Sequence, residues 1–281
     1  MIKRLTYIFF TLLTFLNVKI GHAQHYQFSQ FYAAPTYLNP AFTGANACSR
    51  LALNYRNQWS KIPGTFTTYQ VTLDHAVKKI NSGIGFQFYS DNAGIGSLRT
   101  TQFNLLYAYE IKINKVYGAR AGISVGGVQR SIDYSALVFG DQIARGGAAT
   151  TVDDITINRK FYLDIAAGGL FYNENAWVGL SANHLTNPDQ SLQNGNQSRL
   201  PIEYKLHGGY KFAFEGDKSS SSKINPERNS ITITSNYKKQ AKFNQLDLGF
   251  YYSKNLLYLI LFLLSYISVF HFLLFYFLYF L

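Results

Sequence analysis

The chain has 281 residues, of which 47% are apolar, 17% aromatic and only 15% charged, and its formal net charge is +11. Disordered chains are poor in aromatic residues and disulfide scaffolds need several cysteines, so 23 Phe, 22 Tyr and one Cys exclude both classes. Soluble domains usually carry about 25% charged residues, a larger share than this chain has. Its basic residues are scattered and form no stripe, which argues against a nucleic-acid partner.

Residues 1–23 are expected to be a cleaved export signal. A basic head and a short apolar stretch, within residues 3–16, precede Gly21-His22-Ala23, which places small residues at −3 and −1 of a cut between Ala23 and Gln24. The alternative is a membrane-anchoring helix, but its apolar stretch is shorter than the ~20 residues that a span needs. Export predicts a mature protein outside the inner membrane, where the single Cys48 is expected to be buried or inert.

Residues 24–49 are expected to form an N-terminal segment on the periplasmic side that is compact over residues 25–46, and the alternative is a poorly ordered arm. Asn39 and Pro40 favour a turn, because the residue before a proline avoids the helical region and asparagine tolerates turn geometry. Gly44 can adopt a positive φ where the chain turns again.

Residues 50–254 alternate with period two, which is typical of half-polar strands. Tyr69, Val71 and Leu73, for example, fall on one face, and polar residues stand between them. We expect ten strands, within residues 50–56, 67–74, 84–88, 102–112, 118–125, 161–172, 176–184, 203–214, 229–237 and 243–253.

The connections between these strands indicate an outer-membrane β-barrel. Strand parity places two long polar loops, 131–160 and 185–201, on one side, and three tight turns on the other. Long outer loops and short periplasmic turns are typical of such barrels. The segment 215–228 breaks this rule, because it is long but falls on the side of the short turns. Either it is a periplasmic insertion or one strand is miscounted. The alternative is a soluble β-sandwich, but the polar faces carry Gly, Gln, Asn and Thr rather than a mixture of Lys and Glu.

Residues that carry catalytic or metal chemistry are sparse. The six histidines are dispersed, and none has a metal-ligand spacing with Cys, Asp or Glu. Asp153 and Asp154 could hold calcium but are expected to be solvated in a loop. Asn183 and His184 are similar to a hydrolase dyad, but no Gly-x-Ser-x-Gly accompanies them. The sequence therefore predicts no enzyme, no cofactor and no metal site.

The tail departs from the alternating pattern. From residue 256 to residue 281 there is no Lys, Arg, Asp or Glu, and the run is long enough for a membrane helix. We expect residues 255–281 to be an apolar, helix-like tail that cannot continue the strands. Two explanations remain open: a sequence read out of frame after Lys254, which would leave the barrel incomplete, or a genuine helical anchor.

Four motifs stand out over about residues 24–254. The most specific lies after the signal, and its characteristic positions are Gln30, Tyr32, Pro35, Asn39, Pro40, Ala41 and Gly44. The weaker ones are Tyr55-Arg-Asn-Gln-Trp59 with Pro63, Val178–Leu185 and Phe243–Tyr252. Together these motifs resemble the PorP/SprF family of type IX secretion system membrane proteins.

This resemblance implies an outer-membrane barrel of about fourteen strands that performs no chemical step. It implies binding or retention of secreted type IX cargo, such as gliding adhesins, contacts with periplasmic or outer-membrane secretion components, and a surrounding of lipid and lipopolysaccharide. It provides no residue-level site. The alternatives are an outer-membrane porin or transporter, which would need an open lumen lined by opposed charges, and a soluble secreted β-protein.

Overall fold

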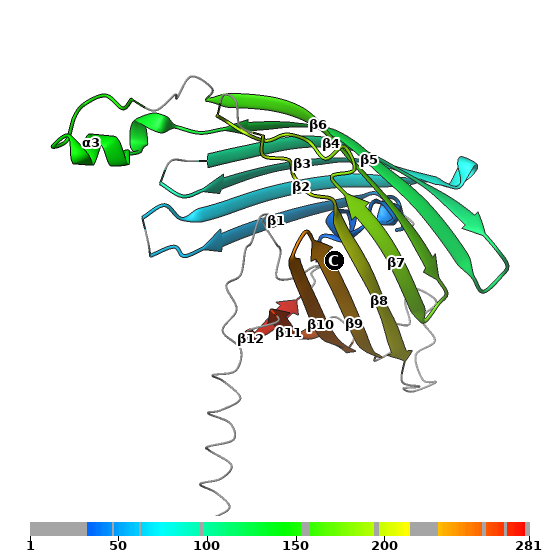
Figure 1. Ribbon diagram of the computed structural model, residues 1–281. Helices are drawn as coiled ribbons and strands as arrows, with labels where there is room; N and C mark the ends of the chain where they lie inside the picture. The colour runs from blue at the N-terminus through cyan, green and yellow to red at the C-terminus, as the bar shows by residue number, and fades with distance from the viewer. Residues whose placement is uncertain are drawn as a thin grey trace, which may run out of the picture. The chain divides into compact units, whose positions relative to one another are not determined.

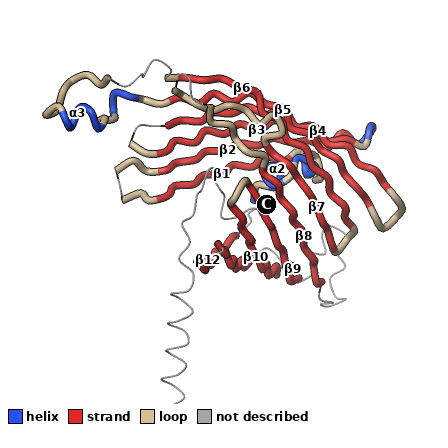
Figure 2. Tube along the Cα trace, in the orientation of Figure 1, coloured by secondary structure: helices blue, strands red, loops and turns tan. Residues whose placement is uncertain are grey.

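The computed structural model consists mainly of antiparallel strands (Figures 1 and 2). It describes residues 33–46, 48–61, 63–95, 98–152, 158–193, 197–213, 230–254, 257–266 and 269–278. The strands are β1 (Arg50–Gln58), β2 (Phe66–Val77), β3 (Ser82–Ala93), β4 (Leu98–Lys112), β5 (Gly118–Ser131), β6 (Arg159–Tyr172), β7 (Ala176–Asn183), β8 (Glu203–Ala213), β9 (Ser230–Gln240), β10 (Phe243–Lys254), β11 (Leu257–Tyr266) and β12 (Val269–Leu278). The helical turns are α2 (Pro35–Leu38), η2 (Pro40–Phe42), η3 (Lys78–Ile80), η4 (Tyr134–Ala136) and α3 (Gly140–Ala144).

The strands follow one another in the sheet in their order along the chain. Side-chain amides stabilise two of the short turns that make this meander possible. Asn114 Oδ1 accepts hydrogen bonds from the amides of Val116 and Tyr117, and Asn173 Oδ1 accepts from those of Asn175 and Ala176. The expected all-β antiparallel fold is confirmed, and the ten expected strands coincide with β1–β10.

The chain divides into two compact units. The larger comprises residues 26–171 and 180–204, and therefore holds β1–β5, almost all of β6 and the end of β7. The smaller comprises the described residues within 172–179 and 205–281. In the larger unit β1–β6 lie side by side, and the loop that carries α3 extends beyond their ends (Figure 1).

The tail is not helical where the structure describes it, so that expectation is wrong. β11 and β12 continue the sheet, because β10 pairs with β11 from Lys254↔Leu257 to Gln245↔Tyr266, and β11 pairs with β12. The missing alternation misled the interpretation, since a run rich in Phe, Tyr, Ile and Leu has a high strand propensity and need not alternate. The out-of-frame hypothesis concerns the DNA and stays a prediction, tested by reading the genomic sequence beyond the codon for Lys254.

Two further expectations concern single features. Cys48 is exposed, so its expected burial is wrong, and its inertness stays a prediction. Among the described residues, no helix has the length and apolar character needed to cross a membrane. The insertion at residues 215–228 and the pair Asp153 and Asp154 lie outside the described residues.

Candidate functional site

The sheet of the larger unit exposes its apolar face and buries its polar face. One row of directly paired apolar side chains crosses five strands and is exposed throughout: Leu51, Leu73, Phe86, Leu105 and Val125. The neighbouring row, Thr72, Gln87 and Asn104, is buried. A sheet in water buries its apolar side, so the opposite arrangement suits a chain surrounded by lipid.

The smaller unit shows the same inversion. Among its described residues, the buried side chains are polar or charged, whereas large apolar side chains of the same strands are exposed. The buried ones include Lys205, His207, Thr234, Asn236, Lys238, Gln245 and Asp247, and the exposed ones include Leu206, Tyr210, Phe212, Ile233, Leu246 and Phe250.

The polar face of the larger unit is covered by residues 33–46, which we call the N-terminal segment. It consists of α2 and η2, and Asn39 separates them in an extended conformation (φ −156°, ψ 123°). Pro40 begins η2 because its fixed φ suits the first position of a helical turn. Residues 33–46 are therefore compact, whereas the expected segment 24–49 as a whole and its position on the periplasmic side stay predictions.

Asn39 is fully buried and uses both ends of its side-chain amide. Its Nδ2 donates to the backbone oxygens of Gly169 and Leu180, each at 3.0 Å, and its Oδ1 accepts from the amide of Ala41 at 2.9 Å. This one side chain therefore shapes the turn and also fastens it to β6 and β7. Ser181 adds a hydrogen bond to the carbonyl oxygen of Leu38 at 2.8 Å.

The side chain of Arg120 holds the next part of the segment by donating hydrogen bonds to backbone carbonyl oxygens. Its Nε donates to the carbonyl oxygen of Ala41 at 2.9 Å, and a terminal nitrogen donates to that of Thr43 at 2.5 Å. The guanidinium is nearly buried, and its other terminal nitrogen lies 3.6 Å from a carboxylate oxygen of Glu110. A buried cation needs such partners, because leaving it unpaired costs several kcal/mol, roughly 3–5.

Asp74 fixes the end of the segment. Its carboxylate accepts from the amide of Gly44 at 2.7 Å and from Nε of Arg50 at 2.8 Å. Gly44 has φ +63°, and a Cβ there would lie 2.5 Å from Cα of Gly83. The turn expected at Gly44 therefore exists, and both its conformation and its close approach to β3 require glycine.

Two strand glycines complete the surface against which the segment packs. A Cβ on Gly122 would lie 2.3 Å from the amide nitrogen of Ala41, and one on Gly168 would lie 2.1 Å from Oδ1 of Asn39. Both distances are far below van der Waals contact, so these strands admit the segment only because they lack side chains here. We call Asp74, Gly83, Arg120, Gly122, Gly168 and Ser181 the seat.

The structure brings together five of the seven motif residues singled out in the sequence: Pro35, Asn39, Pro40, Ala41 and Gly44. Gln30, Tyr32, Ala23 and Gln24 lie outside the described residues. Sequence reasoning missed the seat itself. Its one available signal was Arg120, a single charge among small residues in Gly118-Ala-Arg-Ala-Gly122.

The two long loops are tied to one another. Tyr134 donates from its hydroxyl to the carbonyl oxygen of Leu192 at 3.2 Å, and Arg130, at the end of β5, donates to the side chain of Gln190. Lys160 forms an ion pair with Asp189 at 2.5 Å. The hydrogen bond from Lys160, together with those from the amides of Ser198 and Ser191, lowers the pKa of Asp189 to about 2.

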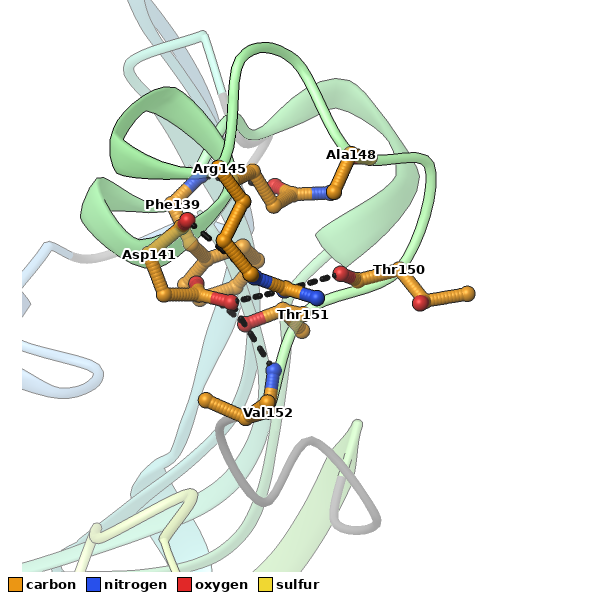
Figure 3. A network of polar contacts seen from close by, with 8 residues as sticks. Phe139, Asp141, Arg145, Ala148, Thr150, Thr151 and Val152 are labelled. Atoms are coloured by element: carbon orange, nitrogen blue, oxygen red, sulfur yellow. Dashed lines mark hydrogen bonds and ion pairs between the residues drawn. The ribbon is translucent and has the colours of Figure 1, made fainter.

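The first of these loops is built around Asp141 (Figure 3). Its carboxylate accepts from the Thr151 hydroxyl at 2.8 Å, from the amide of Val152 at 3.0 Å and from the guanidinium of Arg145, which also donates to the carbonyl oxygen of Thr150. Desolvation raises the pKa of Asp141, but these hydrogen bonds outweigh it and hold that pKa at about 2. The loop is therefore ordered by a charged centre in solvent.

The structure assembles no metal site from the residues that it describes: no group of three or more His, Cys, Asp or Glu side chains lies close enough to hold an ion. Asn183 and His184 bind different partners. Asn183 donates to Glu203 at 3.0 Å, whereas His184 Nδ1 lies 2.8 Å from the Asp164 carboxylate. The dyad suggested by the sequence is thus split between two carboxylates.

Comparison with known families gives one match. The model of the family described as type IX secretion system membrane protein PorP/SprF matches residues 20–266, which span the N-terminal segment, the seat and β1–β11. The match extends beyond Lys254, where the resemblance had been expected to end. No curated protein and no solved structure matches the chain.

Proposed function

Because the chain belongs to the PorP/SprF family of type IX secretion system membrane proteins, we propose that it is an outer-membrane β-barrel that binds or retains secreted surface proteins, such as gliding adhesins. The barrel performs no chemical step in this proposal. It holds an exported partner at its outer loops and connects with secretion components in the periplasm or the outer membrane.

The inverted sheet is the observation that carries the proposal. Exposed apolar rows across β1–β5 suit contact with lipid and lipopolysaccharide, and strands of 9–15 residues are long enough to cross the hydrocarbon layer. A soluble secreted β-protein with this surface would expose far more contiguous apolar area than water tolerates.

The two tied loops support the binding role. They connect successive strand pairs by parity, so both leave the sheet at the same side, and the Asp141 and Asp189 centres order them without a hydrophobic core. An ordered loop presents a fixed surface to a partner, which lowers the entropy cost of binding.

The alternative of a porin is less well supported. A porin needs an open polar lumen, whereas in the larger unit the N-terminal segment lies on the polar face and is bonded to it. Single-channel conductance in a planar bilayer distinguishes the two functions: the accessory barrel gives closed or very small conductances, and a porin gives steady open channels.

The membrane topology can be tested on whole cells in a Cys48→Ser background. Val138→Cys, in the first long loop, should react with an impermeant maleimide on intact cells, whereas Lys115→Cys, in the tight β4–β5 turn, should react only after lysis. The reverse pattern would mean inverted topology. Recovery of the protein in a soluble fraction, with equal labelling of both cysteines, would refute the barrel.

The retention role is tested by deleting the gene. Secreted adhesins should then be lost from the cell surface and restored by the full chain, and a deletion without effect on secretion or surface retention would refute the role. Export adds a prediction that the structure does not test: the membrane-extracted protein should begin at Gln24, and a start at Met1 would contradict cleavage after Ala23.

A further inference from the structure

Six buried polar side chains connect the N-terminal segment to the start of the second long loop. They are Thr36, Gln87, Asn104, Gln102, Asp164 and His184, and we call them the amide relay. Each is at least nine-tenths buried. The set begins in α2, crosses β3, β4 and β6, and ends at the residue that follows β7.

Each neighbouring pair of the relay is hydrogen-bonded. Gln87 Nε2 lies 3.3 Å from Thr36 Oγ1, Asn104 Nδ2 lies 3.0 Å from Gln87 Oε1, and Gln102 Nε2 lies 2.7 Å from Asn104 Oδ1. Gln102 Nε2 also lies 3.4 Å from Asp164 Oδ2, which is 2.8 Å from His184 Nδ1. The contacts therefore form an unbroken path.

The three amides all donate in the same direction, toward Thr36. An amide has a donor end and an acceptor end, so a chain of amides has two arrangements, and reversing one amide requires reversing all of them. Asp164 selects between the two, because its Oδ2 accepts a hydrogen bond from Gln102 Nε2, and this contact exists only when Gln102 presents its N–H toward Asp164. Chains of this kind polarise one another, which strengthens each bond.

The far end of the relay holds the root of the second long loop. His184 has φ +60°, a conformation that non-glycine residues adopt rarely and that the surrounding bonds must maintain. Next to it the Leu185 amide donates to the carbonyl oxygen of Ile165 at 2.9 Å, and the Thr186 hydroxyl donates to that of Leu163 at 3.0 Å. A shift of Asp164 would therefore move the anchor of the loop on β6.

We propose that the amide relay couples docking of the N-terminal segment to the conformation of the loop that begins at His184. Docking supplies Thr36 as the last acceptor of the polarised chain and stabilises the arrangement in which Gln102 donates to Asp164. Release of the segment removes that acceptor, weakens the chain and loosens the loop root. By reciprocity, a partner that changes the loop changes how firmly the segment is held. This coupling goes beyond the proposed function: it lies within the chain, and it can be tested without a secretion partner.

The experiment uses the full chain, extracted from membranes, with Cys48→Ser and one reporter cysteine. The Ala34→Cys reporter detects release of the segment, since Ala34 is buried in it, and the Ser191→Cys reporter detects loosening of the loop, since Ser191 is buried there. Thr36→Val removes the acceptor at one end and Asp164→Asn removes the directing carboxylate at the other. Gln70→Leu is the matched control, because Gln70 is a buried amide on the same face whose side-chain hydrogen bond is to Thr72.

Each relay variant should raise the labelling rate of the reporter at the opposite end by about twofold to thirtyfold. Thr36→Val should act on the Ser191→Cys reporter, and Asp164→Asn on the Ala34→Cys reporter, whereas Gln70→Leu should change neither rate by as much as twofold. If each relay variant alters only the nearby reporter, the path carries no coupling and the proposal is wrong. If Asp164→Asn does not fold, Thr36→Val decides, since valine keeps the shape of threonine.

Discussion

Asp74 in the seat and Asp141 in the first long loop share two kinds of bond in opposite surroundings, and Asp141 has a third bond, from the Thr151 hydroxyl. Each carboxylate accepts from one backbone amide, Gly44 or Val152, and from one arginine, Arg50 or Arg145. The Asp74 side chain is fully buried, whereas that of Asp141 is partly exposed and its arginine more so. The comparison shows that the number of bonds does not measure their importance: water can replace lost partners at Asp141 but not at Asp74.

The largest expected effect follows from removing the central cation of the seat. Arg120→Ala leaves two buried carbonyl oxygens without their donor, so the free energy of unfolding should fall by about 3 kcal/mol. Urea unfolding measures it, and labelling of the Ala34→Cys reporter should rise in parallel. The matched change in the loop, Arg145→Ala, should leave the urea midpoint unchanged, and equal losses in the two variants would refute the contrast.

A smaller effect is expected from filling the seat. Gly168→Ala places a Cβ against Oδ1 of Asn39 and should lower the free energy of unfolding by about 1–3 kcal/mol. The adjacent Gly169→Ala is the control, because its Cβ would meet its nearest atom at an ordinary 3.9 Å. Similar thermal midpoints for the two variants would show that the segment does not pack tightly against β6.

Acid should reduce the order of the two long loops. The folded pKa of Asp141 and of Asp189 is lowered to about 2, below the ordinary value of about 3.9. Their contribution to loop order is therefore complete above about pH 4 and is lost as the pH falls through about 2. Hydrogen exchange of residues 140–152 between pH 5 and pH 2 measures this, and in Asp141→Asn the acid-induced loss for that loop should be much smaller.

The smallest effect concerns salt. The Lys160–Asp189 pair joins the two loops near solvent, and such pairs weaken as ions screen them. Raising the ionic strength from about 0.01 M to 1 M should slightly increase labelling of the Ser191→Cys reporter, whereas labelling of the buried Ala34→Cys reporter should stay constant. An equal response at both positions would mean that the seat is as open to water as the loops.

The strands were predictable because the period-two pattern is local, and each of β1–β10 carries it. The turn at Asn39 and Pro40 was predictable for the same reason, since Pro40 fixes its own φ and restricts the backbone of the residue before it. The seat was not, because Arg120 meets the segment across 77 and 79 positions of the chain and no local pattern encodes such a distance. The tail was misjudged because strand formation at residues 257–278 depends on pairing with β10 and on strand propensity, which alternation alone does not reveal.

The long reach of Asn39 has a consequence for the order of folding. Its partners Gly169 and Leu180 follow it by 130 and 141 positions, so the segment is synthesised early and its binding surface late. Contacts between such distant positions close large loops and form slowly. The segment therefore docks only after β6 and β7 have formed and paired.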